Sequence, residues 1–174
     1  PTRRSSDLND SAAIVAPGTG ATSLIDIRGD LTGSVTLGGS LARLNAEGFA
    51  NHADIRTGGD ANVLARYNLG AADNSSINTA QRVDSIRAVN WRVSETTRKT
   101  IAAPTLGRLE ITGDRQHAGV FEAQLTLTGP QQGAPSGTRT LTSATVAGGV
   151  FDSTWTITGN VGTIDLGPTA RRWT

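Results

Sequence analysis

The feature that most constrains this chain is a short phrase that returns along most of its length. Residues 34–48 read SVTLGGSLARLNAEG, a short alternating segment, a Gly-Gly corner and a second alternating segment. The apolar pattern of Leu41, Leu44 and Ala46 recurs 42 positions later and again 120 positions later. Such shifts lie near multiples of about 20 residues, which indicates an array of short structural repeats.

Within each repeat the apolar residues alternate, as at Ile25 and Ile27 or at Leu109 and Ile111. Alternation places these residues on one face of a β-strand, and no stretch carries the apolar stripe of an amphipathic helix. One pair of strands buries too little surface to stand alone, whereas stacked copies share a continuous core. The sequence therefore predicts an all-β fold, a parallel β-helix (β-solenoid) of about 20 residues per coil. Parallel β crossovers are right-handed by default, so a right-handed solenoid is expected.

The repeats define one solenoid domain over residues 21–167, and two stretches interrupt the pattern. Residues 94–105 are charged and then contain proline, and residues 129–137 read GPQQGAPSG. Proline and glycine at this density do not sustain a strand ladder. Both stretches are predicted excursions, with residues 9–20 a loop or partial coil and residues 168–174 a cut or frayed end.

Residues 1–8, PTRRSSDL, closely resemble the translation of a common sequencing adapter. We therefore expect a non-native tail that takes no part in the fold. Without this segment the chain holds 14 basic and 14 acidic residues, so its apparent basicity disappears. The same interpretation makes the chain a bacterial, metagenomic fragment, truncated at one or both ends.

Composition removes several classes of function. The chain has no cysteine, which excludes disulfides, thiol catalysis and thiolate metal sites. No apolar run approaches the ~20 residues of a membrane helix, so no transmembrane segment is expected. Balanced charge, and the absence of a basic face with interleaved aromatics, argue against a nucleic-acid partner.

The six-residue phrase Val161-Gly162-Thr163-Ile164-Asp165-Leu166, matched by residues 106–111, resembles degenerate repeats of large bacterial β-helical surface proteins. These are haemagglutinin-like and adhesin-like exoproteins, and the resemblance covers most of residues 21–167. It implies a non-enzymatic module, outside the cell or on its surface, acting as a structural spacer or adhesin fragment. The implied partners are neighbouring repeats of a longer parent chain, surface glycans and host or matrix molecules. The resemblance carries over no catalytic residue, cofactor or metal ligand.

Two short motifs and two histidines have functional interpretations that the structural ones outweigh. Arg28-Gly29-Asp30 spells an integrin-recognition tripeptide, but Gly29 is already needed for a turn. Gly58-Gly59-Asp60 begins like a calcium-binding β-roll repeat, which requires tandem copies to supply enough oxygen ligands. His52 and His117 stand far apart with no glutamate or second histidine at ligand spacing, and are expected in exposed loops.

Threonine-rich segments near the C-terminus could stack into a flat surface of hydroxyl groups. They lie at residues 126–128, 140–142 and 154–158, and stacked hydroxyl rows of this kind occur in ice-binding solenoids. Threonine is also a favourable outward residue in any strand. We favour the second interpretation, because the rows are confined to the C-terminal third.

A carbohydrate-active or carbohydrate-binding β-helix, similar to polysaccharide lyases or hydrolases, is the alternative function. Several carboxylates lie between inward positions of the predicted strands and so face outward: Asp26, Asp54, Asp84, Glu110 and Asp165. Arginines alternate with them at Arg56, Arg87 and Arg108. Such a mixed face more often supports solubility and ion pairing than catalysis. A loop-walled groove over several carboxylates would favour the enzyme, and scattered, paired carboxylates would favour the spacer.

Overall fold

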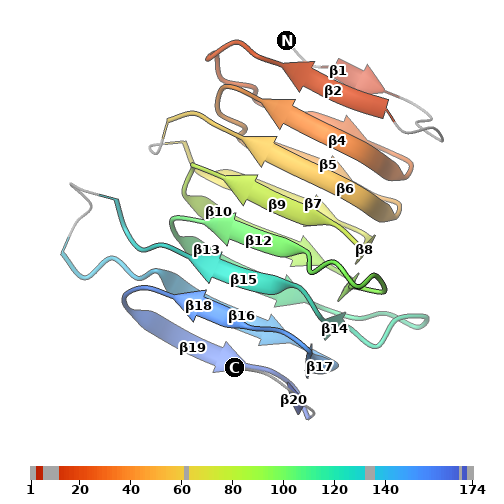
Figure 1. Cartoon of the computed structure of the whole chain (residues 1–174), viewed down its shortest axis with the longest axis vertical. Helices are drawn as coiled ribbons and strands as arrows, with labels where there is room; N and C mark the ends of the chain where they lie inside the picture. The colour runs from red at the N-terminus through yellow and green to blue at the C-terminus, as the bar shows by residue number, and fades with distance from the viewer. Residues whose placement is uncertain (1–2, 6–11, 61–62, 132–135, 169, 172–174) are drawn as a thin grey trace.

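The chain folds as a stack of β-strand coils. The computed structural model describes residues 3–5, 12–60, 63–131, 136–168 and 170–171. In Figure 1 the chain runs from a coil at one end of the stack to a coil at the other. The stack is a parallel β-solenoid of about seven turns, with about 22 residues per turn. The predicted all-β, parallel fold is confirmed, each coil is slightly longer than expected, and the right-handed sense stays a prediction.

One wall of the solenoid is a parallel sheet, sheet A, of eight described strands. In spatial order these strands are β1 (Arg3–Ser5), β3 (Ile25–Ile27), β5 (Arg43–Ala46), β7 (Ala65–Leu69), β10 (Val83–Ala88), β13 (Leu106–Ile111), β16 (Leu141–Val146) and β19 (Val161–Asp165). Spatial order equals chain order, so each coil lays one strand beside its predecessor.

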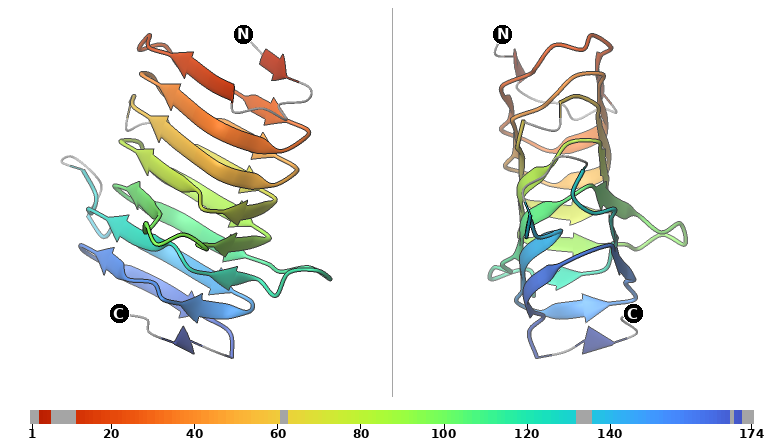
Figure 2. Two further views of the ribbon diagram at one scale, coloured as in Figure 1. Left: turned by 45° about the vertical axis from the view of Figure 1, so that its right-hand side comes forward. Right: turned by 90° about the vertical axis from the view of Figure 1, so that its left-hand side faces the viewer.

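The opposite wall is sheet B, whose described strands number twelve. They are β2 (Ala12–Ala16), β4 (Leu31–Leu37), β6 (Ala50–Thr57), β8 (Ala71–Asp73), β9 (Ser76–Thr79), β11 (Asn90–Arg92), β12 (Thr100–Ala103), β14 (Val120–Phe121), β15 (Gln124–Leu127), β17 (Gly149–Phe151), β18 (Trp155–Ile157) and β20 (Ala170–Arg171). The long strand β6 pairs with both β8 and β9, so one strand per coil becomes two from there onward. Figure 2 shows the two walls facing each other, with loops projecting beyond them.

The repeated phrase forms the strands of sheet A. In β10, β13 and β16 the first, fourth and sixth residues are buried, and the second, third and fifth face outward. The fourth residues of successive coils are direct Cα partners: Ile25, Leu44, Tyr67, Ile86, Leu109, Ala144 and Ile164. This inward column is the continuous core that a single repeat could not bury alone. The outward residues form what we call the outer face of sheet A.

The Gly-Gly corners, residues 38–39 and 58–59, allow neighbouring coils to approach each other closely. A Cβ on Gly38 would lie 2.5 Å from the backbone oxygen of Pro17, and one on Gly58 would lie 2.4 Å from that of Gly38. Backbone therefore stacks directly on backbone at these corners. Among the corner glycines Gly38, Gly39, Gly58 and Gly59, it is Gly59, with φ of 92°, that takes the left-handed conformation favourable to glycine.

Loops interrupt the coils at places that differ partly from the expected ones. The excursion expected over 94–105 is a loop of residues 93–99 followed by β12, because Ile101 and Ala103 alternate into the core. The excursion expected over 129–137 lies between β15 and β16, with residues 132–135 outside the described part. A further loop of residues 112–119 joins β13 to β14 and was not anticipated.

The N-terminal segment contributes two described strands. Residues 3–5, within the adapter-like tail, pair as β1 with β3, and β2 lies within residues 9–20, the expected loop or partial coil, and pairs with β4. Parallel pairing uses main-chain groups, so it does not depend on which side chains the segment carries. The adapter origin stays a prediction; residues 1–2 and 6–11 lie outside the described part. At the other end, β20 falls within 168–174, of which 169 and 172–174 are likewise outside.

Candidate functional site

The carboxylates singled out in the sequence are divided between the two walls. Asp54 lies on β6 of sheet B, whereas Asp84 lies on β10 of sheet A. The Oδ2 atom of Asp54 is 2.8 Å from Nη2 of Arg56, and this hydrogen-bonded pair raises the pKa of the arginine. The Oδ2 atom of Asp84 is 2.7 Å from Nε of Arg66. Each carboxylate is thus held in its own ion pair, on a different face of the molecule.

The remaining acidic residues on sheet A are spread along and across the strands. Asp84 and Glu110 lie on neighbouring strands, but about 10 Å of strand separates their positions along the chain direction. Asp26 accepts a hydrogen bond from Nδ2 of Asn45 at 3.4 Å, and Asp165 accepts one from the backbone of Gly167 at 3.3 Å. Among the described residues, no three His, Asp or Glu side chains are grouped closely enough to hold a metal ion.

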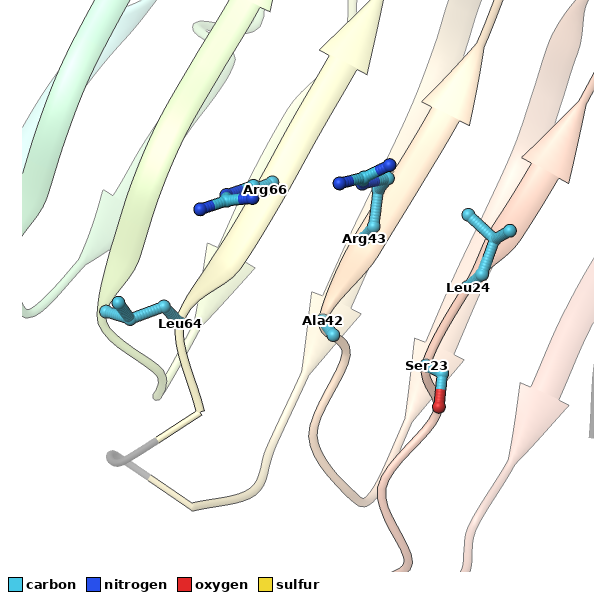
Figure 3. A pocket seen from close by; sticks show the side chains of 6 residues that line it. All are labelled: Ser23, Leu24, Ala42, Arg43, Leu64 and Arg66. Atoms are coloured by element: carbon cyan, nitrogen blue, oxygen red, sulfur yellow. The ribbon is translucent and has the colours of Figure 1, made fainter.

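The outer face of sheet A nevertheless carries two adjoining hollows that share one arginine. The smaller has a volume of about 260 Å³, and Figure 3 shows Arg43 and Arg66 above it, with Leu24 and Leu64 at its sides. The larger, about 610 Å³, extends from Arg66 across β10 and β13 to β16. We call the two hollows together the sheet A groove.

Small outward residues create the larger hollow. Gly107 occupies the second place of its phrase, where a Cβ would lie 2.4 Å from the backbone oxygen of Asp84. Ser85, Thr142 and Ser143 supply short hydroxyl side chains around it. No described lining residue comes from the loops at 93–99, 112–119 or 128–140, so the groove is open along the sheet and is not walled by loops.

Arginines follow one another along this groove on four consecutive strands. Arg43 of β5 and Arg66 of β7 are direct Cα partners, and Arg108 of β13 lies in the same register row, with Ser85 of β10 between. Arg87 lies two residues further along β10. The pattern of alternating charges predicts Arg87 and Arg108 on this face but does not include Arg43 and Arg66. The signal that could have found them is the tripeptide Leu-Ala-Arg, which occurs at both 41–43 and 64–66.

His52 and His117 occupy different environments, and neither is isolated. His52 lies within strand β6, not in a loop, and its Nε2 atom is 2.6 Å from Oε1 of Glu95. Lys99 lies 3.1 Å from the other oxygen of that carboxylate. The hydrogen bonds from Lys99 and then His52 lower the pKa of Glu95, so the loop 93–99 is fastened to sheet B by an ionised carboxylate.

His117 belongs to the unanticipated loop and fastens that loop instead. Its Nδ1 atom is 3.0 Å from Oδ1 of Asp114, and its ring meets Phe49 edge-on with centroids 5.8 Å apart. The pKa of Asp114 is lowered mainly by the backbone N–H of Gln116, and further by His117. These contacts hold the loop against the solenoid and form no cluster of metal ligands.

The two tripeptide motifs, residues 28–30 and 58–60, form hydrogen bonds to a neighbouring coil. In 28–30 the Oδ1 atom of Asp30 accepts a hydrogen bond from the backbone N–H of Phe49 at 2.8 Å, which links neighbouring coils. In 58–60 the backbone N–H of Asp60 donates to Oγ of Ser40 at 2.7 Å. A structural role in joining neighbouring coils therefore explains the aspartate of each motif.

The threonine rows do not combine into one surface. Thr126 and Thr156 are direct partners on the outer face of sheet B, whereas Thr142 lies on sheet A and Thr140 is buried. The arrangement gives two stacked threonines in place of a flat hydroxyl array.

With this geometry in view, no protein-family model, curated protein or solved structure matches the chain. Across the described residues, no helix is long and apolar enough to cross a membrane.

Proposed function

We propose that this chain is a non-enzymatic β-solenoid module of an extracellular or cell-surface protein, acting as a structural spacer or as part of an adhesin. The observation that carries the proposal is the separation of the carboxylates. Asp54 forms an ion pair with Arg56 on sheet B, and Asp84 forms one with Arg66 on sheet A. Separate, exposed ion pairs of this kind are typical of solvated protein surfaces.

The coil architecture supports the same proposal. Each coil of about 22 residues adds one more layer to the same inward column, so the fold extends in one direction by simple repetition. Long, stiff shapes of this kind suit a spacer, and broad outward walls suit attachment to a partner.

The competing function, cleavage of a polysaccharide, has one observation in its favour. Asp84 and Glu110 share the larger hollow with Arg66, Arg87 and Arg108. Against it, the Oδ2 atom of Asp84 is 2.7 Å from Nε of Arg66, and among the described residues no loop lines the hollow to exclude water. The groove is therefore better suited to contact than to acid–base chemistry.

The direct test is incubation of the chain with acidic and neutral polysaccharides, with new reducing ends and unsaturated products measured over time. We expect no release above a buffer control. Release that Asp84→Asn or Glu110→Gln abolishes, with the fold intact by circular dichroism, would establish the enzyme and overturn the proposal.

Location is tested separately. Antibodies raised against the chain should label intact cells of the source organism or its culture medium. Labelling that requires permeabilised cells would contradict a surface or extracellular placement.

A further inference from the structure

The sheet A groove presents arginines on four consecutive strands. Arg43, Arg66 and Arg108 share one register row, in which Ser85 is the partner of both Arg66 and Arg108. Arg87 lies two residues further along β10. Neighbouring strands are about 4.8 Å apart, so the series extends about 14 Å along the solenoid axis. All four side chains belong to sheet strands and not to loops, which fixes their spacing.

Two carboxylates offset part of this charge, since Asp84 pairs with Arg66 and Glu110 is the direct cross-strand partner of Arg87. Within the described residues, the guanidinium groups of Arg43, Arg87 and Arg108 make no hydrogen bond or ion pair. Arg43 stands directly opposite Arg66 across the strand pair, an arrangement that is unfavourable for like charges. An anion bound between the guanidinium groups would relieve this repulsion.

The shape and remaining polarity of the groove restrict the kind of anion. Its hollows adjoin at Arg66 and run across the strands, so they admit an extended chain more readily than a compact ligand. Hydroxyls of Ser85, Thr142 and Ser143 line one hollow, and Leu24 and Leu64 border the other. A ligand that fits would carry spaced negative groups, many hydroxyls and some apolar C–H surface.

We propose that the sheet A groove binds an anionic polysaccharide whose chain runs along the solenoid axis. Carboxylate or sulfate groups of the sugar would accept charge-assisted hydrogen bonds from Arg43, Arg87 and Arg108, since the guanidinium fork matches both groups. Glu110 and the serine and threonine hydroxyls would accept from or donate to the sugar hydroxyls. The site rests on the proposed adhesive function and gives it a ligand class.

Nucleic acid fits the same groove less well. The larger hollow sets Arg66, Arg87 and Arg108 against Asp84 and Glu110, which leaves a small positive excess. A phosphate backbone has far denser charge and calls for a strongly basic strip. Base stacking would need exposed aromatic rings, and Tyr67, the aromatic residue in the described strands of sheet A, is buried.

The test is affinity electrophoresis and calorimetry at low salt with four probes: a polygalacturonate oligomer, a dextran sulfate oligomer, neutral dextran and duplex DNA. Polygalacturonate carries only carboxylate groups and dextran sulfate only sulfate groups, so their comparison separates the two anion sources. We expect binding to at least one anionic glycan, little binding to neutral dextran, and weakening as salt screens the charges. The double variant Arg43→Gln/Arg108→Gln should weaken binding at least about tenfold, the loss expected for removed charge-assisted bonds.

Arg56→Gln is the matched control, because Arg56 is an exposed arginine on a strand of the opposite wall. This variant should bind like the unmodified chain, and circular dichroism should show both variants folded. Equal binding by the double variant, equal binding of neutral dextran, or tighter binding of duplex DNA than of either anionic glycan would overturn the proposal. Cleavage of a bound glycan would overturn the proposed non-enzymatic function but not the binding site. If the folded, unmodified chain binds neither anionic glycan, the binding site is overturned and the spacer function remains.

Discussion

The rings of Trp91 and Phe121 lie 6.2 Å apart, centroid to centroid, on neighbouring coils inside the solenoid. The two residues are direct partners of β11 and β14, and both are fully buried. Phe121 also meets Trp155 edge-on at 5.7 Å, so one phenyl ring joins two indoles across three coils. Phe121 therefore adds ring contacts on both sides to the strand ladders that join these coils.

Replacement of Phe121 by alanine should lower the free energy of unfolding by about 3–5 kcal/mol, because a cavity replaces ring contacts on both sides. Chemical denaturation followed by tryptophan fluorescence measures this loss. Phe49→Ala is the control, since Phe49 is half exposed and contacts only the loop residue His117 among aromatic rings of the described chain. We expect about 1 kcal/mol or less there, and similar losses at both sites would contradict a core role for Phe121.

The inward half of the fold was predictable from the sequence. Leu44 corresponds through Tyr67 to Ile86 two coils later, as the shift of 42 positions indicated. Leu41 and Val83 are both buried, but a register shift after Val83 means that they are not exact equivalents. The pattern remains visible because the inward places of sheet A carry mainly apolar side chains. The alternation likewise marked Leu109 and Ile111 as buried.

The outward half was not predictable, because coil length varies. Arg66 stands opposite Arg43, 23 positions away, and meets Asp84 only 18 positions further on. A uniform shift of about 20 residues pairs Leu44 with the exposed Leu64, whereas Tyr67 is its true partner. Outward places accept any polar residue, so few sequence signals can correct such errors, and the Leu-Ala-Arg tripeptide at 41–43 and 64–66 is one of them. The loop at 112–119 was missed for the same reason, since its polar residues are compatible with either a strand face or a loop.

Gly107→Ala should destabilise sheet A, because the new Cβ would lie 2.4 Å from the backbone oxygen of Asp84 and force β10 and β13 apart. We expect a loss of about 1–3 kcal/mol in thermal or chemical unfolding. Gly29→Ala is a suitable control, since nothing lies within 4 Å of a Cβ at that position. A Gly107 variant as stable as the Gly29 variant would show that the strands can separate without cost.

The loop 93–99 should loosen on acidification. Lys99 and His52 lower the pKa of Glu95, so their contacts with its carboxylate contribute stability above the ordinary glutamate pKa. That contribution is lost as the pH falls through the lowered pKa of Glu95 in the folded chain. Amide exchange of residues 93–99, measured against pH, should rise in that acidic window while the strands of sheet A stay protected.

Two variants make this pH experiment specific. In Glu95→Gln, the amides of residues 93–99 should exchange faster at neutral pH, and the rise in their exchange on acidification should disappear. In Glu47→Gln, a change in the turn between β5 and β6, the exchange rate at neutral pH and the rise on acidification should both match those of the unmodified chain. A transition that persists in Glu95→Gln would mean that another group fastens the loop.

The last described coil should promote self-association. Ile164 of β19 occupies the same inward column as Leu109 and Leu44, yet 36% of its surface is exposed, and Val161 on the same strand is 42% exposed. The described partner of β19 is β16 alone, so its other edge presents unpaired main-chain groups. Such an edge with apolar side chains is a template for further strand pairing.

Sedimentation velocity should show assembly that grows with concentration and that Ile164→Lys reduces. Thr36→Lys adds the same charge to an exposed outward place on β4 and should leave assembly unchanged; equal effects of the two variants would point to net charge and not to the open coil.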